Sequence, residues 1–142
     1  MLDKHDYGAL SEFRSRLVHF FRFSQRTAAA AGVTSPQYLL LLHLRGFAQR
    51  EWATVGELAG RLLASHQAAA ALVQRCAAKG LVRKRRNARD ARCVEIHLTA
   101  AGRRLVERVA LHHGDELARL RDLLNAIAAR RRVRARGGIS HA

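Results

Sequence analysis

Proline and cysteine are almost missing from this sequence, and long apolar stretches are missing altogether. The 142 residues include 1 Pro and 2 Cys, and no apolar run reaches the ~20 residues that cross a bilayer. With few helix breakers and abundant Ala and Leu, the chain is expected to be mostly helical. Two cysteines are too few for a disulfide framework, and the N-terminus lacks the basic and apolar regions of a signal peptide. The expected location is therefore the reducing cytoplasm, with no membrane partner.

Acidic residues are also scarce. Asp and Glu number 11 against 26 Lys and Arg, which gives a formal net charge of +15. Such an excess indicates a polyanionic partner, and the dense phosphates of nucleic acid make it the leading candidate. An anionic membrane surface is the main rival, but a membrane-surface protein would concentrate its charge on one amphipathic helix.

The sequence contains no pattern typical of an enzyme, a cofactor or a metal site. The acidic residues are scattered, and there is no Gly-rich phosphate loop. The 8 histidines include no His-x₃-His spacing, and adjacent His112 and His113 would point about 100° apart on a helix. We therefore expect a binding protein with no catalytic residue, no cofactor and no metal.

The first predicted helix covers residues 11–31 and ends at Gly32. Its apolar stripe is wider than one neighbouring helix would cover, so a second surface such as a subunit interface is expected to bury the remainder. The stripe comprises Leu10, Phe13, Leu17, Phe20 and Phe21.

The second predicted helix begins with Ser35 as its N-cap and Pro36 at the first helical position, and ends near Gly46. Residues 38–44 are apolar almost all round. Such a helix is expected to be buried on every side, at the centre of the fold.

Two short helices follow in close succession. Thr54 and Glu57 have the spacing of a capping box, which starts the first of them. Ser65 caps the second, which runs to Lys79 before Gly80. Two helices joined this tightly predict a helix-turn-helix.

After Gly80 the apolar period changes from that of a helix to that of a strand. Residues 81–86 and 93–98 predict a β-hairpin whose basic tip is formed by residues 87–92. Thr99 then caps a helical region that includes residues 104–127, with a break near His112–Gly114. Residues 129–142 are Arg-rich and then Gly-rich, and are expected to be disordered.

Five short motifs follow one another along the chain: residues 50–59 (Arg-Glu-Trp-Ala-Thr-Val-Gly-Glu-Leu-Ala), 72–75 (Leu-Val-Gln-Arg), 79–82 (Lys-Gly-Leu-Val), 90–92 (Asp-Ala-Arg) and 98–102 (Leu-Thr-Ala-Ala-Gly). Their order and spacing resemble those of the MarR family of transcriptional regulators. The last two match the family's Asp-x-Arg wing signature and its Leu-Thr-x-x-Gly motif. The resemblance covers roughly residues 11–127.

This resemblance implies a fold and a mode of action. The expected fold is mainly α with a small β-hairpin wing, a winged helix-turn-helix with N- and C-terminal dimerisation helices. One domain would span residues 1–142, with dimerisation helices at 11–31 and 104–127 and a winged helix-turn-helix lobe at 35–103. The expected function is that of a homodimeric, sequence-specific transcriptional regulator of double-stranded DNA. It would bind a pseudo-palindromic operator as a repressor, and a small ligand would relieve repression.

The second helix of the helix-turn-helix supplies the first group of candidate DNA contacts. At about 100° per residue, Ala69, Leu72, Val73 and Cys76 share an inward face. Glutamine can pair with adenine and Ala methyl groups can touch thymine, so the opposite face suits base contact. Ser65 and His66 lie at the helix N-terminus, which favours phosphate. The candidates on this helix are Ser65, His66, Gln67, Ala70, Ala71, Gln74 and Arg75.

The predicted hairpin supplies the second group. Its candidates are Lys84, Arg85, Arg86, Arg89, Asp90 and Arg92. By resemblance, Arg92 would enter the minor groove, where narrow A-tracts concentrate negative potential. Asp90 repels phosphate, so its expected role is to orient an arginine. A solvated charge run with no DNA role is the alternative for this segment, and simple solvated residues are the alternative for the two glutamines.

An effector pocket is predicted from polar and aromatic residues in otherwise apolar helices: His19, Phe23, His43 and Phe47. A satisfied core histidine is the alternative for His43. Cys76 is expected in the core. Cys93 points away from the apolar side of its strand, which leaves a redox role open.

The rival function is that of a nonspecific nucleoid-type or RNA-binding basic protein. It would explain the net charge and the Ala-rich face at residues 68–71. It would not explain a helix-turn-helix followed by a wing signature.

Overall fold

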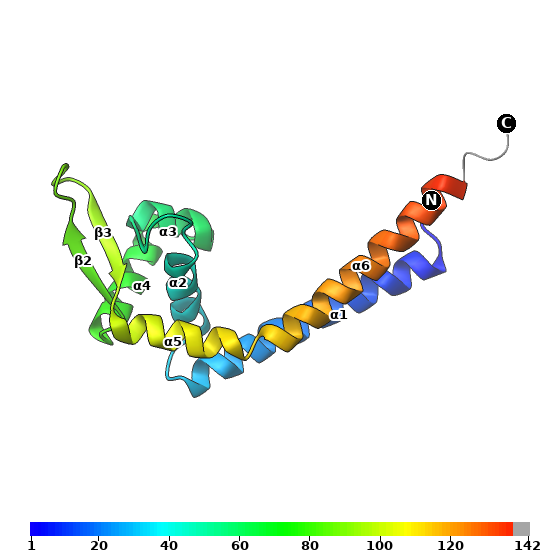
Figure 1. Ribbon diagram of the computed structural model, residues 1–142, viewed down its shortest axis with the longest axis horizontal. Helices are drawn as coiled ribbons and strands as arrows, with labels where there is room; N and C mark the ends of the chain where they lie inside the picture. Colours follow the sequence, from blue (N-terminus) through cyan, green and yellow to red (C-terminus); the bar gives the residue numbers. More distant parts are fainter. Residues whose placement is uncertain (138–142) are drawn as a thin grey trace. The chain divides into compact units, whose positions relative to one another are not determined.

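The computed structural model describes residues 1–137, with side chains up to Arg132. Its elements are α1 (Lys4–Ala30), α2 (Ser35–Arg45), β1 (Trp52–Ala53), α3 (Val55–Leu62), α4 (His66–Ala78), β2 (Val82–Arg86), β3 (Val94–Leu98), α5 (Ala100–Leu111) and α6 (Gly114–Gly137). The expected fold class, mainly α with a small wing, is confirmed (Figure 1). The chain divides into two compact units: residues 25–111, called the lobe, and residues 1–24 with 112–142, called the helical pair.

Helix α2 is the centre of the lobe and packs against α3, α4, α5 and β3. Leu40, Leu41 and Leu44 are fully buried in its core. The expectation that α2 is buried on every side is wrong, because Leu39 and Leu42 are 38% and 36% exposed. An apolar sequence all round a helix does not by itself supply neighbours on every side.

The N-cap of α2 is Thr34, one residue before the predicted Ser35. The Thr34 hydroxyl accepts the Gln37 N–H at 3.3 Å, and Gln37 Oε1 accepts the Thr34 N–H at 3.0 Å. This reciprocal capping box satisfies two free donors at once, which a cap at Ser35 would not do.

The helix-turn-helix has the predicted caps. Thr54 and Glu57 form the reciprocal capping box of α3, and Ser65 Oγ accepts the Ala68 N–H of α4 at 3.1 Å. Between the helices, Leu63 has φ 51° and ψ 41°, the left-handed conformation usually held by glycine. Gly32 and Gly80 hold positive φ angles after α1 and α4.

The predicted hairpin is confirmed as β2 and β3, and a strand that was not predicted joins it. The antiparallel order is β1-β3-β2, with Trp52 opposite His97 and Arg85 opposite Glu95. Strand β1 has only two residues, too few for an alternating pattern to be recognised in the sequence.

Gly102 allows α5 to begin directly against the backbone of Leu81. A Cβ atom at residue 102 would lie 2.0 Å from the Leu81 carbonyl oxygen, so no side chain fits there. Thr99 accepts the Gly102 N–H at 3.0 Å and donates to the Gly80 carbonyl at 2.6 Å. The Leu-Thr-x-x-Gly motif therefore joins the sheet to α5.

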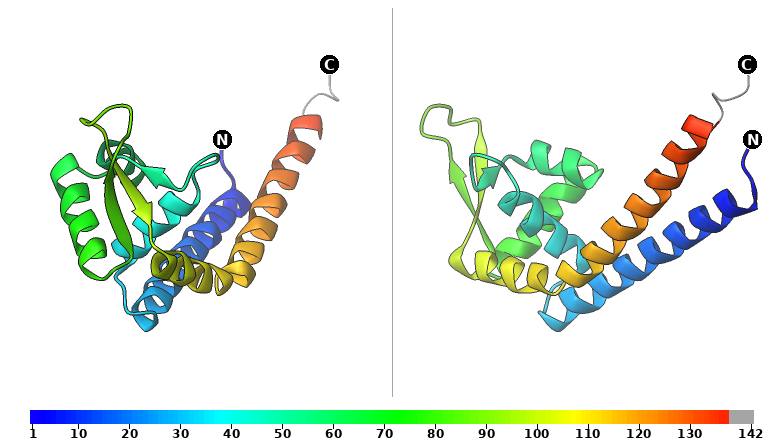
Figure 2. Two further views of the ribbon diagram at one scale, coloured as in Figure 1. Left: turned by 60° about the vertical axis from the view of Figure 1, so that its left-hand side comes forward. Right: turned by 45° about the vertical axis from the view of Figure 1, so that its right-hand side comes forward.

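Within the helical pair, α6 runs antiparallel to α1, and the two helices separate toward the chain ends (Figures 1 and 2). His113, which directly precedes α6, packs against two aromatic rings of α1. The centroid of its ring lies 5.6 Å from that of Phe20 and 5.5 Å from that of Phe23. The break predicted at His112–Gly114 separates α5 from α6.

Disorder was expected from Ala129, but α6 continues to Gly137. Its last turns are rich in Ala and Arg, which are strong helix formers, and this local propensity extends the helix into the predicted tail. Residues 138–142 of the predicted tail lie outside the described residues.

Candidate nucleic-acid interface

Helix α4 has the two faces expected of a recognition helix. Ala69, Leu72, Val73 and Cys76 are buried, which confirms the inward face. Gln67 and Gln74 are exposed on the opposite side, and Ala70 and Ala71 are half-buried beside them. Ser65 and His66 are exposed at the helix N-terminus, where free backbone N–H groups favour an anion.

Arg75 is exposed, but it lines a groove beside α4 that neither Gln67 nor Gln74 lines. The groove measures about 480 Å³ and is mostly apolar. It lies between α4, α2, the α3–α4 turn and the end of α1. Its lining comprises Gln25, Ser35, Pro36, Leu39, Leu62, Ala64, Ala68, Ala69, Leu72 and Arg75. This groove was not predicted from the sequence, because residues from four separate segments form it.

The basic residues of the wing are directed to solvent. Arg83, Lys84, Arg85 and Arg86 on β2 are all exposed, as are Arg89 and Arg92 at the tip. The hairpin projects from the body of the lobe (Figure 1). Within residues 25–111, 15 Lys or Arg residues accompany only 5 acidic ones, so the lobe carries most of the positive charge of the chain.

Several other cations of the lobe are engaged in its own structure. Lys79 donates to the Gly32 carbonyl at 2.8 Å and to Gln37 Oε1 at 3.1 Å. Arg45 and Arg103 both pair with Glu51. These cations stabilise the lobe through contacts within it, whereas the cations of the wing are exposed to solvent.

Arg50 is another of these structural cations. It pairs with Glu57 and lies over the Trp52 ring, with its guanidinium carbon 4.3 Å from the ring centroid. Burial alone would raise the pKa of Glu57, but hydrogen bonds from Arg50 and Thr54 outweigh burial and lower it.

The wing tip is shaped by side chains that accept backbone N–H groups. Asn87 Oδ1 accepts the N–H groups of Arg89 at 2.9 Å and Asp90 at 3.1 Å. Asp90 Oδ1 accepts the N–H of Arg92 at 3.0 Å. Asp90 was predicted to orient an arginine, and in the structure it holds the backbone of Arg92.

Trp52, Glu95 and His97 form a cluster that no sequence motif predicts. His97 stacks on Trp52 with a centroid separation of 6.3 Å and an interplanar angle of 29°. Glu95 Oε1 lies 3.3 Å from His97 Nε2. Strand alternation puts Glu95 and His97 on the same face of β3, and the contact of His97 with Trp52 depends on the unpredicted strand β1.

The four predicted effector-pocket residues divide between the two units. His43 and Phe47 belong to the lobe, whereas His19 and Phe23 belong to the helical pair, where Phe23 packs against His113. Burial, and secondarily the positive charge of Arg61, lower the pKa of His43. Phe47 packs beneath Arg50 and Arg61, whose guanidinium carbons lie 4.9 and 4.4 Å from its ring centroid.

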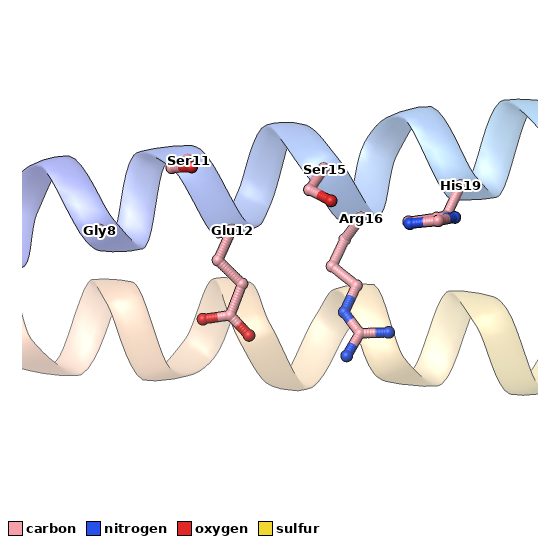
Figure 3. Close-up of a pocket in the computed structure, with 6 residues that line it drawn as sticks. All are labelled: Gly8, Ser11, Glu12, Ser15, Arg16 and His19. Atoms are coloured by element: carbon pink, nitrogen blue, oxygen red, sulfur yellow. The ribbon is translucent and has the colours of Figure 1, made fainter.

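His19 lines a groove of about 520 Å³ along α1. Figure 3 shows Glu12 and Arg16 extending from α1 toward the ribbon of α6, with Ser11, Ser15 and His19 beside them. Gly8 completes the lining. The groove is polar, so it lacks the apolar walls that most small-molecule sites have.

The two cysteines have different surroundings. Cys76 is fully buried, as expected of a core residue, and burial raises the pKa of its thiol to about 11. Cys93 is half-buried immediately before β3. Among the described residues, no group of three His, Cys, Asp or Glu side chains could hold a metal ion. No helix among them is long and apolar enough to span a membrane.

The family model that matches this chain is that of the MarR family, over residues 31–92. No curated protein matches the chain by sequence. The predicted resemblance to the MarR family is confirmed by the family model and by the solved structures that share the fold.

Three solved structures illustrate the similarity of the fold. AbsC, a MarR family transcriptional regulator from Streptomyces coelicolor, has a TM-score of 0.70 at 19% identity, with 96% of each chain covered. A MarR family protein from Bacillus stearothermophilus has a TM-score of 0.72 at 20% identity, with 97% of this chain and 99% of that chain covered. A point mutant of MepR from S. aureus, bound to an oligodeoxyribonucleotide, has a TM-score of 0.66 at 18% identity, with coverages of 98% and 100%.

Proposed function

We propose that this chain, which matches the MarR family over residues 31–92 and has the fold of its solved members, is a dimeric transcriptional regulator that binds double-stranded DNA. The carrying observation is the juxtaposition within one lobe of a two-faced helix α4 and an exposed basic wing. The S. aureus relative with the same fold is bound to an oligodeoxyribonucleotide, which supports the choice of ligand.

The proposed binding mode assigns different tasks to the helix and the wing. Helix α4 enters the major groove, where Gln67 and Gln74 contact base edges and Ala70 and Ala71 contact thymine methyl groups. Ser65 and His66 lie near a phosphate. Lys84, Arg85, Arg86 and Arg89 bind phosphates, while Arg92 enters the minor groove.

The dimer follows from the geometry of DNA and from the exposed apolar residues of the helical pair. Two recognition helices must lie about one DNA turn, ~34 Å, apart to read a pseudo-palindromic operator. Tyr7, Leu10, Val18 and Phe21 are large apolar residues of α1 that remain exposed in the single chain. A second copy of the helical pair would bury them.

We further propose that the protein is a cytoplasmic repressor and that a small ligand relieves repression from the groove beside α4. Apolar walls and one cation at the rim, Arg75, suit an apolar molecule with a single carboxylate. Ala68 and Leu72 line the groove from α4, so an occupant would contact the recognition helix directly and change how it is held against the lobe. Release of DNA by an aromatic carboxylate, but not by its uncharged amide, would support this site. Release that persists in Arg75→Gln would favour the pocket predicted from His19, Phe23, His43 and Phe47.

A salt titration of DNA affinity tests the main proposal. If the dimer contacts ~8 phosphates, log affinity falls with log salt at a slope of about −7. Gln67→Ala should leave this slope unchanged and reduce discrimination between an enriched duplex and a scrambled one, because glutamine carries no charge. Gln49→Ala is the matched control, since Gln49 is exposed outside the helix-turn-helix.

The converse result is expected for the wing. Replacing Arg85 and Arg86 with Ala should weaken binding to both duplexes alike and flatten the slope. Replacing Arg104 and Arg108, two exposed arginines of α5, removes the same charge elsewhere in the lobe and should affect the slope less. If the wild-type protein binds both duplexes equally, the nonspecific nucleoid-type function replaces that of a regulator.

A further inference from the structure

The wing tip is connected to strand β3 through Asn87. Asn87 is half-buried, whereas the next residues on either side, Arg86 and Ala88, are exposed. Its N–H donates to the Cys93 carbonyl at 2.9 Å, which closes the hairpin. Its side-chain oxygen accepts two N–H groups of the tip, and its side-chain nitrogen donates to Glu95 Oε2 at 3.4 Å. Asn87 thus joins the conformation of the tip to a residue of the sheet.

Glu95 is the second member of this chain of contacts. It is only 8% exposed although it lies in the most basic part of the protein. A buried carboxylate is costly unless it accepts hydrogen bonds. The structure supplies two partners, Asn87 and His97, and gives no ion pair between Glu95 and its cross-strand neighbour Arg85 among the described residues. Glu95 therefore contacts Asn87 and His97 and does not pair with Arg85, whose side chain is exposed to solvent.

His97 and Trp52 extend the contacts to the far edge of the sheet. The imidazole of His97 stacks on Trp52 of β1, and Arg50 lies over the Trp52 ring. Arg50 is itself paired with Glu57 at the start of α3. A continuous series of contacts therefore runs from the first helix of the helix-turn-helix to the wing tip.

We propose that Asn87, Glu95 and His97 are positioning residues that hold the wing tip in the conformation presenting Arg92 to DNA. They act without touching DNA, and the proposal rests on the proposed DNA-binding function. Asn87 holds the backbone of Arg89 and Asp90, and Asp90 in turn holds that of Arg92. Ordering a free loop costs conformational free energy for each residue at the moment of binding. A tip that is already ordered avoids this cost, which raises affinity.

The test compares variants at constant charge and in two backgrounds. Glu95→Ala and Glu95→Gln remove the same negative charge, but only glutamine retains an oxygen that can accept from Asn87. The probe is a labelled duplex enriched from a random-sequence pool by the wild-type protein. We expect Asn87→Ala to bind this duplex about tenfold more weakly than wild type does. We expect Glu95→Ala to bind it about tenfold more weakly than Glu95→Gln does.

The second background separates positioning from general destabilisation. In a protein that carries Arg92→Ala, we expect Asn87→Ala to have little further effect, because the tip no longer has the side chain that it presents. An equal loss of affinity in both backgrounds would overturn the proposal, since a merely structural role acts whether or not Arg92 is present. An unchanged affinity in Asn87→Ala, while Arg92→Ala weakens binding, would also overturn it and leave the proposed function intact. If Arg92→Ala itself changes nothing, the proposed wing contact fails and the positioning role fails with it.

Trp52 provides a readout that does not depend on DNA. It is the only tryptophan of the chain, and it stacks on His97. Loss of both side-chain oxygens at residue 95 should free the His97 ring and shift the fluorescence of Trp52 in Glu95→Ala, whereas Glu95→Gln, which keeps one of these oxygens, should remain close to wild type. Identical spectra for wild type and Glu95→Ala would contradict the link between Glu95 and Trp52.

Discussion

The lobe and the helical pair differ in how far each buries its own apolar residues. All 18 residues of the main core cluster belong to the lobe, from Ala28 to Val109, and most are almost fully buried. In the helical pair, the residues described as buried are Ser24 and His113, which are both polar. Large apolar side chains remain exposed on both of its helices, among them Leu10 and Phe21 on α1 and Leu117 and Leu124 on α6.

This difference separates a unit whose apolar core is completed within one chain from a unit whose apolar residues would be covered by a second chain in the proposed dimer. Each large apolar side chain that leaves water stabilises the buried state by about 1.5–3 kcal/mol. The lobe obtains this stabilisation within residues 25–111. The helical pair would obtain this stabilisation by associating with a second copy. The same association would link two lobes and so raise their joint affinity for DNA. The predictions below change one unit at a time.

The largest expected effect is that of Gly102→Ala on the lobe. The new Cβ would overlap the Leu81 carbonyl oxygen, and backbone on both sides leaves no flexible side chain to move. We expect a loss of about 3 kcal/mol or more in the free energy of unfolding. Urea denaturation measures it. The control is Gly60→Ala in α3, where a Cβ meets nothing within 4 Å and alanine should instead stabilise the helix. Equal stability of the two variants would show that α5 does not approach Leu81 in this way.

The helical pair should respond to a charge on its exposed apolar surface. Phe21 is 57% exposed in the single chain, so Phe21→Glu costs the isolated chain little. At a subunit interface the same charge would be buried without a partner, and the dimer should dissociate. Sedimentation should detect monomers, and DNA affinity should fall by roughly 100-fold or more as the two lobes lose their linkage. Arg22→Gln makes the same change in charge next to it and should remain dimeric. A dimeric Phe21→Glu protein would contradict the proposed interface.

The sequence was most informative where one local pattern determines structure. The capping box at Thr54, the N-cap at Ser65 and the two strands of the wing could all be predicted, because each depends on neighbours a few residues away. The cap of α2 was misplaced by one residue, since Thr34–Gln37 and Ser35–Pro36 both carry good cap signals. Strand β1 exists only through pairing with β3.

Prediction of the candidate site had the same limit. The inward face of α4 followed from helical period alone. The groove beside Arg75 and the series Asn87–Glu95–His97–Trp52 could not be predicted, because the residues that meet there are distant in sequence. Their side-chain types carry no signal of proximity without the fold.

A smaller effect within the lobe is expected from His43. Burial and the charge of Arg61 lower the pKa of His43 in the folded protein. The unfolded chain therefore binds a proton at a higher pH than the folded chain, so stability is lost as the pH falls through the unfolded value, about 6.5. We expect His43→Gln to reduce the dependence of the unfolding free energy on pH below about 7, and Arg61→Gln to reduce part of it. Parallel pH profiles for wild type and His43→Gln would contradict this.

The smallest effect is expected at Leu63, where the lobe departs from its own pattern of helix ends. Gly32 and Gly80 follow α1 and α4 with positive φ angles, but Leu63 holds that conformation after α3. The left-handed region costs a residue with a Cβ about 1–2 kcal/mol. Leu63 is 95% exposed, so its side chain contributes little packing that a substitution could remove. Glycine loses more entropy on folding, which offsets part of the gain. Leu63→Gly should therefore stabilise the lobe by about 0.5–1 kcal/mol, a rise of about 2–4 °C in Tm.

Leu111→Gly is the matched control: Leu111 is 82% exposed at the end of α5, and glycine in a helix should lower Tm. If both variants lower Tm, Leu63 is not strained and its conformation is simply that of the turn.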